Sequence, residues 1–496
     1  ERFRILHVKR LGPSLVPAEA SLPVSGLGAA LADLAKKLKQ PFALEGLLCN
    51  GGQACEATLL GFIPHDERRF SYNLAWGAAL TVMRAAARTG GRPYATGLYY
   101  AHEAERILGR ERLTRLRGFK AQVDPQDLLN PGKVLTAGGL SRFIGLAQTF
   151  EPLLRPFANA ARAPIGERLA GNGRRGVPSS VAWYAYACAQ CGACVDSCDQ
   201  YYGRIWESQS PRGKWYFLRE VMAGRARMDQ EWVNRFLACT TCELCNVKCP
   251  LDLPIEEAWG QMRGQLIQRE GRMTFPPFEV MRAALRKELN IWASYARDRD
   301  KWVPEDLKAK ILPSAGVAYF AGCTASFVET DVAAGTLRVL DAAGVEFTTL
   351  GKDECCCGLP MLVAGKWDAF ADIVRHNIEA AKARGIKTVV TSCPACWLSW
   401  AVYYKEYAKK LGLSYDIQTR HWSELVAERV RAGQFRFPQQ VPLKVTWHDP
   451  CHMGRAGGIY EPPREVIRAI PGLELVEMEH NRESAHCCGA VLSLVE

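Results

Sequence analysis

The chain has 496 residues, is 48% apolar and 23% charged, and so has an ordinary globular composition, which excludes a disordered chain, a collagen-like chain and a small disulfide scaffold. At roughly 150 residues per domain this length predicts about three domains, and the lack of any run of about 20 apolar residues excludes a transmembrane helix. The net charge is +11, but no dense Lys/Arg tract with interleaved aromatics is present, which argues against nucleic acid as a partner.

The positive charge is concentrated in the first third of the chain. Residues 1–180 hold 25 Lys/Arg and 14 Asp/Glu, whereas residues 181–496 hold 38 of each. This asymmetry predicts two modules. A solvated basic face is the plainest interpretation, and an acidic partner, an anionic substrate or an anionic membrane surface are the alternatives. Because the sequence begins with Glu1 and breaks off seven residues after Gly489, we expect it to be part of a longer protein.

The first third carries no metal-binding motif. Apolar spacing predicts an amphipathic helix over residues 23–38, with Ser25 as its N-cap, and a second helix over Ser71–Thr89. Strand-like stretches at 15–17 and 57–63 flank the first helix. An α+β domain over residues 1–140 is therefore expected.

A short polar motif closes this domain. It consists of Lys120, Asp124-Pro125 and Asn130-Pro131-Gly132-Lys133. The motif and the order of elements before it resemble the C-terminal cap of FAD-linked oxidases of the D-lactate dehydrogenase and glycolate oxidase type. The resemblance implies a ferredoxin-like cap that closes over the flavin, with FAD as cofactor, a small hydroxyacid as substrate, and Asn130, Pro131, Gly132 and Lys133 near the flavin.

The chain departs from that family in two respects. The main FAD-binding domain is not in this chain, so FAD would be held by another segment or by a partner. Stretches that carry His in the family read Gly46–Glu56 and Gly90–Tyr99 here and contain none. Arg92, Tyr94 and Tyr99 are candidate replacements for carboxylate binding and proton handling, and a plain surface loop is the alternative for each. Residues 141–180, rich in Gly and Pro, are expected to form a linker with one helix over Ser141–Leu154.

The next segment contains the bacterial ferredoxin cysteine run twice. The first run is Cys188, Cys191, Cys194 and Cys198. The second is Cys239, Cys242, Cys245 and Cys249, followed by Pro250, where the first run has Asp199. Thiolates are good iron ligands, and the fourth Cys of each run, which should open a helix, ligates the other cluster in two-cluster ferredoxins. We therefore expect two [4Fe-4S] clusters, one on the cluster-one set (Cys188, Cys191, Cys194, Cys249) and one on the cluster-two set (Cys239, Cys242, Cys245, Cys198).

Zinc is the competing interpretation, but zinc sites typically use four ligands in two pairs. The insert between the runs has helical apolar spacing at 214–222 and 232–237. It resembles the α-helical ferredoxin module of succinate dehydrogenase and heterodisulfide reductase iron–sulfur subunits. The expected domain covers residues 181–312.

A second cysteine pattern repeats with a period of about 130 residues. The first copy is Cys323, Cys356-Cys357-Gly358 and Cys393-Pro-Ala-Cys396, and the second is Cys451 with Cys487-Cys488-Gly489. These copies resemble the Cys-Cys-Gly domains of heterodisulfide reductase and of glycolate and lactate oxidation subunits. The resemblance implies non-cubane or additional iron–sulfur clusters that reduce disulfides. Buried thiols without metal are the alternative, and Cys355 is not expected to be a ligand.

We expect the two Cys-Cys-Gly domains at 313–435 and 436–496, and we expect the second to be truncated. Strands predicted at 317–321, 345–350 and 387–392 would deliver cysteines at their carboxyl ends, where α/β sheets place their sites. The stretch at 443–448 would do the same for Cys451. Helices are expected at about 327–343 and 361–384. His448 and His452 flank Cys451 and are either structural or cluster-tuning.

The main functional hypothesis is a D-2-hydroxyacid dehydrogenase that passes electrons from FAD through two [4Fe-4S] clusters to the Cys-Cys-Gly site. The expected acceptor is an electron-transfer flavoprotein, a quinone-linked protein or a disulfide-linked protein. The first alternative is a thiol–disulfide reductase of the heterodisulfide reductase type, with Cys323, Cys356, Cys357, Cys393 and Cys396 as catalytic residues. The second is a non-catalytic electron-transfer subunit of a larger complex. Grouped cysteines without a signal peptide favour a reducing, cytoplasmic location, with peripheral membrane contact as an option.

Overall fold

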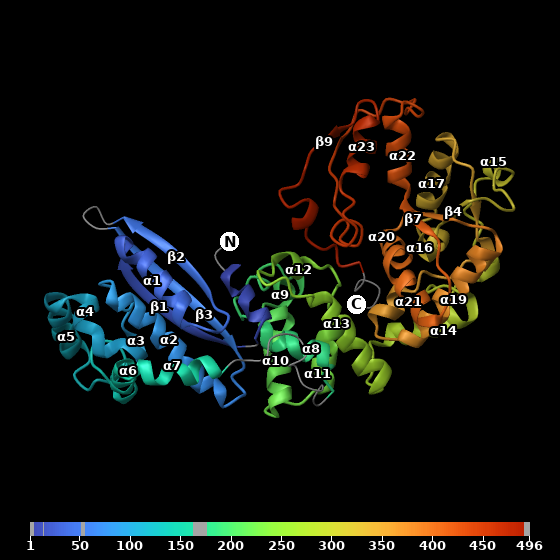
Figure 1. Ribbon diagram of the computed structural model, residues 1–496. Helices are drawn as coiled ribbons and strands as arrows, with labels where there is room; N and C mark the ends of the chain where they lie inside the picture. Colours follow the sequence, from blue (N-terminus) through green and yellow to red (C-terminus); the bar gives the residue numbers. More distant parts are fainter. Residues whose placement is uncertain (1–3, 13, 51–54, 162–175, 491–496) are drawn as a thin grey trace. The chain divides into compact units, whose positions relative to one another are not determined.

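The computed structural model describes residues 4–12, 14–50, 55–161 and 176–490. The chain divides into two compact units. The first comprises Glu1–Gly171 and Ala182–Cys191, and the second comprises Asn172–Val181 and Gly192–Glu496. Each unit is described by itself (Figure 1).

The first unit is built on a three-stranded antiparallel sheet. Its strands β1 (Ser14–Pro23), β2 (Ala43–Asn50) and β3 (Cys55–His65) lie in the order β1-β3-β2. Burial alternates along β1, as expected for a strand with one buried face. Beyond β1, Arg92 forms an isolated bridge with Ser21. This order matches a ferredoxin-like arrangement whose fourth strand is reduced to one bridge.

Two helices supply the core against this sheet. They are α1 (Val24–Lys37) and α2 (Ser71–Arg88). The core joins Val16 and Ile63 from the sheet to Leu34 and to a run of buried alanines in α2, which allow close approach. Both predicted helices are confirmed, but Ser25 is not the N-cap: α1 begins at Val24, after Pro23, and no side chain caps it. The glycine-containing strand β2 was missed because its apolar residues do not alternate cleanly.

The remaining helices of this unit are α3 (Gly97–Tyr100), α4 (Ala104–Leu108), α5 (Arg110–Val123), α6 (Gly139–Thr149) and α7 (Glu151–Ala160), with short 3-10 helices at Arg4–Arg10 and Ala101–Glu103. Helices α6 and α7 replace the single helix expected in the linker. A Cβ on Gly77 of α2 would lie 2.8 Å from the Cβ of Ala158, so α7 packs tightly on α2. The start of the expected linker is therefore part of the first unit.

The cysteine-run part of the second unit is helical. Its helices are α8 (Ser179–Ala187, whose last six residues belong to the first unit), α9 (Asp199–Arg204), α10 (Pro211–Ala223), α11 (Gln230–Leu237), α12 (Leu244–Lys248) and α13 (Ile255–Gly264), with a 3-10 helix at Glu207–Gln209 and a π-helical turn at Gln265–Arg269. The side chains of Ser210 and Asp229 cap α10 and α11 by accepting backbone N–H groups. The helical insert is thus confirmed. Cys198 directly precedes α9, whereas Cys249 ends α12 and opens no helix, contrary to the expectation.

A four-stranded parallel sheet forms the centre of the Cys-Cys-Gly part. The strands β4 (Val317–Phe320), β5 (Thr348–Thr349), β6 (Thr388–Thr391) and β7 (Gln418–His421) lie in the order β5-β4-β6-β7. Strand β5 is much shorter than the stretch predicted at 345–350. The strands before Cys323 and Cys393 are confirmed. The mixed α/β, multidomain class with a parallel sheet is therefore confirmed.

Helices cover both faces of this sheet. One core contains Phe320 and Val389 with residues of α14 (Pro276–Glu288), α18 (Leu359–Val363), α19 (Trp367–Ala383) and α21 (Tyr404–Leu411). The opposite core contains Tyr319 and Val390 with residues of α16 (Gly322–Phe327), α17 (Thr330–Ala342) and α15 (Glu305–Lys308). The helix predicted at about 327–343 is confirmed as α17, which begins at Thr330. The helix predicted at about 361–384 is divided into α18 and α19 at Gly365, whose φ of +75° is unfavourable in a helix.

The remaining elements are α20 (Pro394–Leu398), a π-helical turn (Ser399–Tyr403), α22 (Trp422–Arg431), α23 (Glu461–Ala469), strands β8 (Lys444–Val445) and β9 (Glu474–Leu475), and 3-10 helices at Ala296–Asp298, Gly351–Asp353 and Arg482–Ser484. Strands β8 and β9 pair in parallel. Across the described ranges, no helix is both long and apolar enough to cross a bilayer.

The packing of α7 on α2 gives a stability prediction. Glu151 is fully buried, accepts a hydrogen bond from Thr81 Oγ1 at 2.6 Å, and pairs with Arg155 at 2.9 Å. We expect Glu151→Ala to destabilise the first unit by about 2 kcal/mol, because it removes the carboxylate partner of Arg155 and a buried acceptor of Thr81. Hydrogen exchange of α2 and α7, read by mass spectrometry, should then speed up by at least tenfold. Glu105→Ala, at an exposed position of α4, is the control, and equal exchange in both variants would contradict the packing.

Candidate functional site

Four cysteines from the two ferredoxin runs line one small cavity of the second unit. They are Cys198, Cys239, Cys242 and Cys245, which is the cluster-two set. The loop around Cys242 folds back on itself, since Thr241 and Glu243 both have left-handed backbone angles (φ 58° and 59°). Such angles are uncommon for residues other than glycine. The spacing of the second run therefore turns its three thiols, with Cys198 from the first run, toward one point.

The small cavity combines its four thiols with one buried cation and with the carboxylates of Asp199, Glu243 and Glu256. Burial raises the pKa of the Cys198 and Cys245 thiols, so the cavity alone does not favour thiolates. Lys214 of α10 also lines the cavity and is only 2% exposed. Its ammonium lies 5.9 Å from the ring centroids of both Phe236 and Trp259, and no carboxylate among the described residues pairs with it. Four convergent thiols beside a buried cation fit a thiolate-ligated iron–sulfur cluster.

The cluster-one set is divided between the units. Cys188 and Cys191 belong to the first unit, where Lys9 Nζ donates to the carbonyl of Cys188 at 3.0 Å. Cys194 and Cys249 belong to the second unit, and each is 8% exposed. The common ligation of these four residues stays a prediction.

A larger cavity of about 550 Å³ collects the cysteines of both Cys-Cys-Gly modules. All eight predicted residues line it: Cys323, Cys356, Cys357, Cys393, Cys396, Cys451, Cys487 and Cys488. Thr240, from the second ferredoxin run, lines both this cavity and the small one. The repeat seen in the sequence therefore converges on one space beside the cluster-two set.

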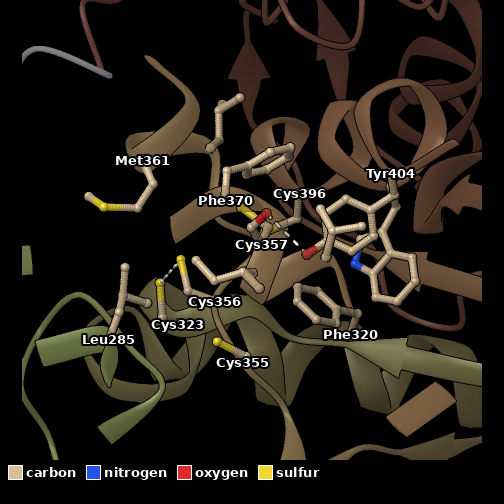
Figure 2. Close-up of a cluster of buried hydrophobic side chains, with 14 of the residues drawn as sticks. Leu285, Phe320, Cys323, Cys355, Cys356, Cys357, Met361, Phe370, Cys396 and Tyr404 are labelled. Atoms are coloured by element: carbon tan, nitrogen blue, oxygen red, sulfur yellow. Dashed lines mark hydrogen bonds between the residues drawn. The ribbon is translucent and has the colours of Figure 1, made fainter. Parts of the chain in front are cut away.

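The thiols of the first module are in mutual contact. Cys323 Sγ lies 3.5 Å from Cys356 Sγ, and Figure 2 shows this pair with the sulfur of Cys355 apart from it. Cys355 is buried but does not line the cavity, in agreement with its predicted exclusion. The Tyr404 hydroxyl donates to the carbonyl of Cys357 at 3.1 Å and fixes the turn.

Hydrogen bonds between the thiols of the first module shift their pKa values. Hydrogen bonds from Cys356 and Cys396 lower the pKa of Cys357 well below its ordinary value. The hydrogen bond from Cys396 likewise lowers the pKa of Cys393. The pKa of the Cys356 thiol is raised, through its bonds to Cys323 and Cys357. The hydrogen bonds thus shift the pKa values of neighbouring thiols in opposite directions, and a shared metal group that ligated all of the sulfurs would replace these bonds.

Two residues that the sequence analysis missed hold the turn before Cys323. Glu354 accepts backbone N–H groups from Ala321 (3.2 Å) and Gly322 (3.0 Å) and pairs with Arg299 at 2.9 Å. Burial raises the pKa of Glu354 to about 7, although Arg299 opposes this. Gly322 has a φ of +76°, and a Cβ there would lie 2.9 Å from Cys396 Sγ. The position of Glu354 directly before three cysteines was the only sequence signal.

The second module meets the ferredoxin loop. Cys242 and Cys487 share a hydrogen bond that, with burial, raises the pKa of Cys242. Asp199 accepts the backbone N–H of Cys487 at 3.0 Å and contacts His486 Nδ1 at 3.2 Å. His452 Nε2 lies 3.1 Å from Thr241 Oγ1, which supports the structural interpretation of this histidine.

His448 also has a hydrogen-bond partner. Its Nε2 lies 2.9 Å from the carbonyl of His486. Both His448 and His452 line the large cavity together with the cysteines, and a hydrogen bond holds each ring in place. This arrangement orients the rings and agrees with a structural role.

The predicted flavin-side residues of the first unit are not gathered into one site. Arg92 pairs with Glu56 at 3.0 Å, so its charge is already engaged, and Tyr94 is 55% exposed. The turn that contains Asn130, Pro131, Gly132 and Lys133 is exposed and is anchored by Lys120, whose ammonium donates to Asp124 (2.6 Å) and to the carbonyl of Leu129 (2.8 Å). The spacing of Lys120 and Asp124 thus has a local structural reason.

Comparison with protein families matches two segments of the chain. Residues 187–254 match a 4Fe-4S dicluster domain, and residues 317–399 and 445–494 match a cysteine-rich domain. A subunit of the dihydromethanophenazine:CoB–CoM heterodisulfide reductase of Methanosarcina acetivorans is 31% identical over 322 residues, which are 61% of this chain and 77% of that subunit. The chain belongs to the family of this heterodisulfide reductase subunit.

Two longer relatives match a smaller share of the chain. The EtfAB:quinone oxidoreductase of Syntrophomonas wolfei is 30% identical over 51% of this chain and 35% of its own length. The probable iron–sulfur-binding oxidoreductase FadF of Bacillus subtilis is 29% identical over 51% of this chain and 36% of its own length. No solved structure matches the chain. The iron–sulfur, 4Fe-4S, electron-transfer and oxidoreductase assignments are confirmed, whereas both family matches begin after residue 186, beyond the segment that resembles an FAD-linked cap.

The lining of the large cavity separates two adjacent cysteines by position, because it includes Cys356 but not Cys355. We expect Cys356→Ala to lower the iron content and to remove the electron paramagnetic resonance signal of the Cys-Cys-Gly site, because the variant loses a cavity sulfur. Cys355→Ala, one residue away and equally buried, should keep both. Iron analysis and spectroscopy of anaerobically purified protein check this. Equal losses in the two variants would contradict the ligand set.

Proposed function

We propose that this member of the heterodisulfide reductase family reduces a disulfide substrate to two thiols in the large cavity, with electrons delivered through the ferredoxin part. The observation that carries the proposal is the convergence of cysteines from both Cys-Cys-Gly modules on one cavity that also borders the cluster-two set. The reaction consumes two electrons and two protons, breaks the S–S bond and forms two S–H bonds. A separate reductant protein supplies the electrons, and solvent supplies the protons.

The proposed ligand sets follow the cavities. The cluster-two set would hold one [4Fe-4S] cluster and the cluster-one set a second, while the eight cavity cysteines would hold further, non-cubane iron–sulfur centres. When bound, these centres supply electrons one at a time, at potentials set by local charge, hydrogen bonds and exposure. The first-module thiols are the proposed catalytic residues because four of the five (Cys323, Cys356, Cys357 and Cys396) are buried and the sulfurs of Cys323 and Cys356 are in contact.

The contact between Cys242 and Cys487 is the proposed crossing point for electrons. Cys242 lines the small cavity and Cys487 lines the large one, and their thiols are in hydrogen-bond contact. Arg455 reinforces this junction, because its guanidinium donates to the carbonyls of Cys242 and Ala485. A rigid junction keeps the distance between the two sites constant, which single-electron transfer requires.

For the first unit we keep a flavin-linked role as a second candidate. The support is the ferredoxin-like strand order together with the anchored turn from Asp124 to Lys133. In that case an FAD-linked partner or further segment would oxidise a hydroxyacid such as D-lactate and feed the clusters. A relative named as an EtfAB:quinone oxidoreductase supports an electron-transfer flavoprotein or a quinone-linked protein as the redox partner. Assembly into a multi-subunit complex is proposed on the same basis.

One assay distinguishes the two candidates. We expect the dithionite-reduced full-length protein to be reoxidised by a small organic disulfide, with two thiols formed per disulfide, as measured by cluster absorbance and thiol titration. Cys393→Ala should lower the rate at least a hundredfold, because a cavity sulfur is lost. Cys49→Ala, at an exposed strand position of the first unit, is the control.

Other outcomes of this assay decide against the proposal. Reoxidation without thiol formation would exclude disulfide reduction and leave an electron-transfer subunit. Rapid cluster reduction by D-lactate, with no turnover of disulfide, would favour the flavin-linked dehydrogenase.

The buried lysine beside the cluster-two set gives a further prediction. Lys214→Met keeps the side-chain length but removes the cation that stabilises the more negative, reduced cluster. The ratio of reduced to oxidised cluster at a fixed potential should fall by about tenfold to a hundredfold. A potentiometric titration followed by electron paramagnetic resonance checks this at unchanged iron content. Lys248→Met, at an exposed position of α12, should leave the ratio within about twofold, and an equal effect of both variants would contradict a local role.

A further inference from the structure

The wall of the large cavity carries a distinctive charge pattern. Apart from its cysteines and two histidines, the lining is mostly apolar and includes Ile291, Trp292, Val328, Leu359 and Pro360. Among the described residues that line it, none is Lys or Arg. The single carboxylate of the lining belongs to Glu329. An entering molecule therefore meets apolar surface and one carboxylate, with no lysine or arginine in the described lining.

The guanidinium groups of Arg299 and Arg455 donate to partners outside the lining, although Arg455 Nη2 has no partner among the described residues. Arg299 is 1% exposed and pairs with Glu354 behind the turn that precedes Cys323. Arg455 donates to backbone carbonyls at the junction with the ferredoxin loop. Neither residue lines the cavity. Within the described lining, the cavity thus has no counter-ion for a carboxylate, sulfonate or phosphate.

The rim of the cavity is formed by one short segment and a tryptophan. Thr324, Val328 and Glu329 are exposed, and Trp292 is 39% exposed. The indole Nε1 of Trp292 donates to Thr324 Oγ1 at 3.4 Å, which holds the ring at this edge. A large aromatic face beside the thiols favours apolar substituents, while the carboxylate of Glu329 repels anions.

We infer that the substrate of this cavity is a disulfide whose substituents are uncharged and apolar, such as amides, esters or alkyl groups, and that Glu329 selects against anionic disulfides. This inference rests on the proposed disulfide reduction and adds the substrate class. An anionic disulfide would lose its hydration on entry without gaining a paired cation, and thiolate ligands would add further repulsion. A neutral disulfide avoids both penalties and gains the apolar contacts.

Dithiodiglycolate and its dimethyl ester provide a matched test, because they share one disulfide core and differ in charge. With the full-length iron-loaded protein, the ester should show a kcat/KM at least about tenfold above that of the dianion. The ester should also perturb the electron paramagnetic resonance signal of the Cys-Cys-Gly site at concentrations at least tenfold lower. The preference should shrink as salt is added.

A charge reversal at the rim tests the residue itself. Glu329→Lys should raise kcat/KM for the dianion at least tenfold and leave that for the ester within about twofold. Glu305→Lys on α15, an equal change of net charge at a side chain that is 87% exposed and does not line the cavity, is the control. If both substitutions raise kcat/KM for the dianion equally, Glu329 does not determine the selectivity against anionic disulfides.

The remaining outcomes separate this inference from the proposed function. If the dianion is bound and reduced as well as the ester by the unaltered protein, the substrate class is wrong while disulfide reduction stands. If neither compound perturbs the signal or is reduced, disulfide reduction and the inference are both overturned.

Discussion

The convergence of buried sulfurs at the carboxyl ends of parallel strands is the constraint on which the second unit depends. Strands β4, β5 and β6 are neighbours, and each is followed by a cysteine of the first module. Parallel pairing brings these three ends to one edge, so residues up to 73 positions apart meet without a long ordered loop. Short strands suffice because helices bury both faces. The apolar layers therefore fix where the thiols meet, and the turns fix only their orientation.

Burial makes charge in the second unit costly, and two of its buried charged side chains are compensated by neighbouring groups of the protein. Glu354 pairs with Arg299 and accepts hydrogen bonds from two backbone N–H groups. Arg464 pairs with Asp449 at 2.6 Å and with Glu477 at 2.7 Å. Both buried charges therefore have partners within the protein. Lys214 differs, because no carboxylate among the described residues forms an ion pair with it, although Asp199, Glu243 and Glu256 line the same cavity. A buried ammonium of this kind is stable only beside negative charge. The ammonium of Lys214 therefore offers local compensation to negatively charged ligands in the small cavity, where burial alone raises the pKa of the Cys198 and Cys245 thiols.

The sequence predicted the parts of the site that depend on local spacing. The cysteine runs, the helical insert and the strands before Cys323 and Cys393 follow from spacing and periodicity, and the structure brings the cluster-two and cavity sulfurs together. Contacts between distant segments could not be predicted, since no local pattern pairs Arg299 with Glu354 or α7 with α2. The FAD-linked cap came from resemblance alone, and its proposed residues include Arg92, whose charge the structure pairs with Glu56. Predictions of local structure from cysteine spacing and apolar periodicity were therefore accurate. The sequence could not determine residue roles that depend on a ligand or on a distant partner.

The one irregularity of the ferredoxin motif is explained by the neighbouring module. Asp199 stands where the second run has Pro250, and proline offers neither a side-chain acceptor nor a backbone donor. The Asp199 carboxylate accepts the N–H of Cys487 and contacts His486, so it fixes the second Cys-Cys-Gly turn directly beside the first run. Cys487 then touches Cys242 of the second run. A ferredoxin that only exchanged electrons with separate proteins would gain nothing from this carboxylate. The carboxylate instead ties the ferredoxin part to the Cys-Cys-Gly part within this unit, which supports the proposal that electrons pass between them.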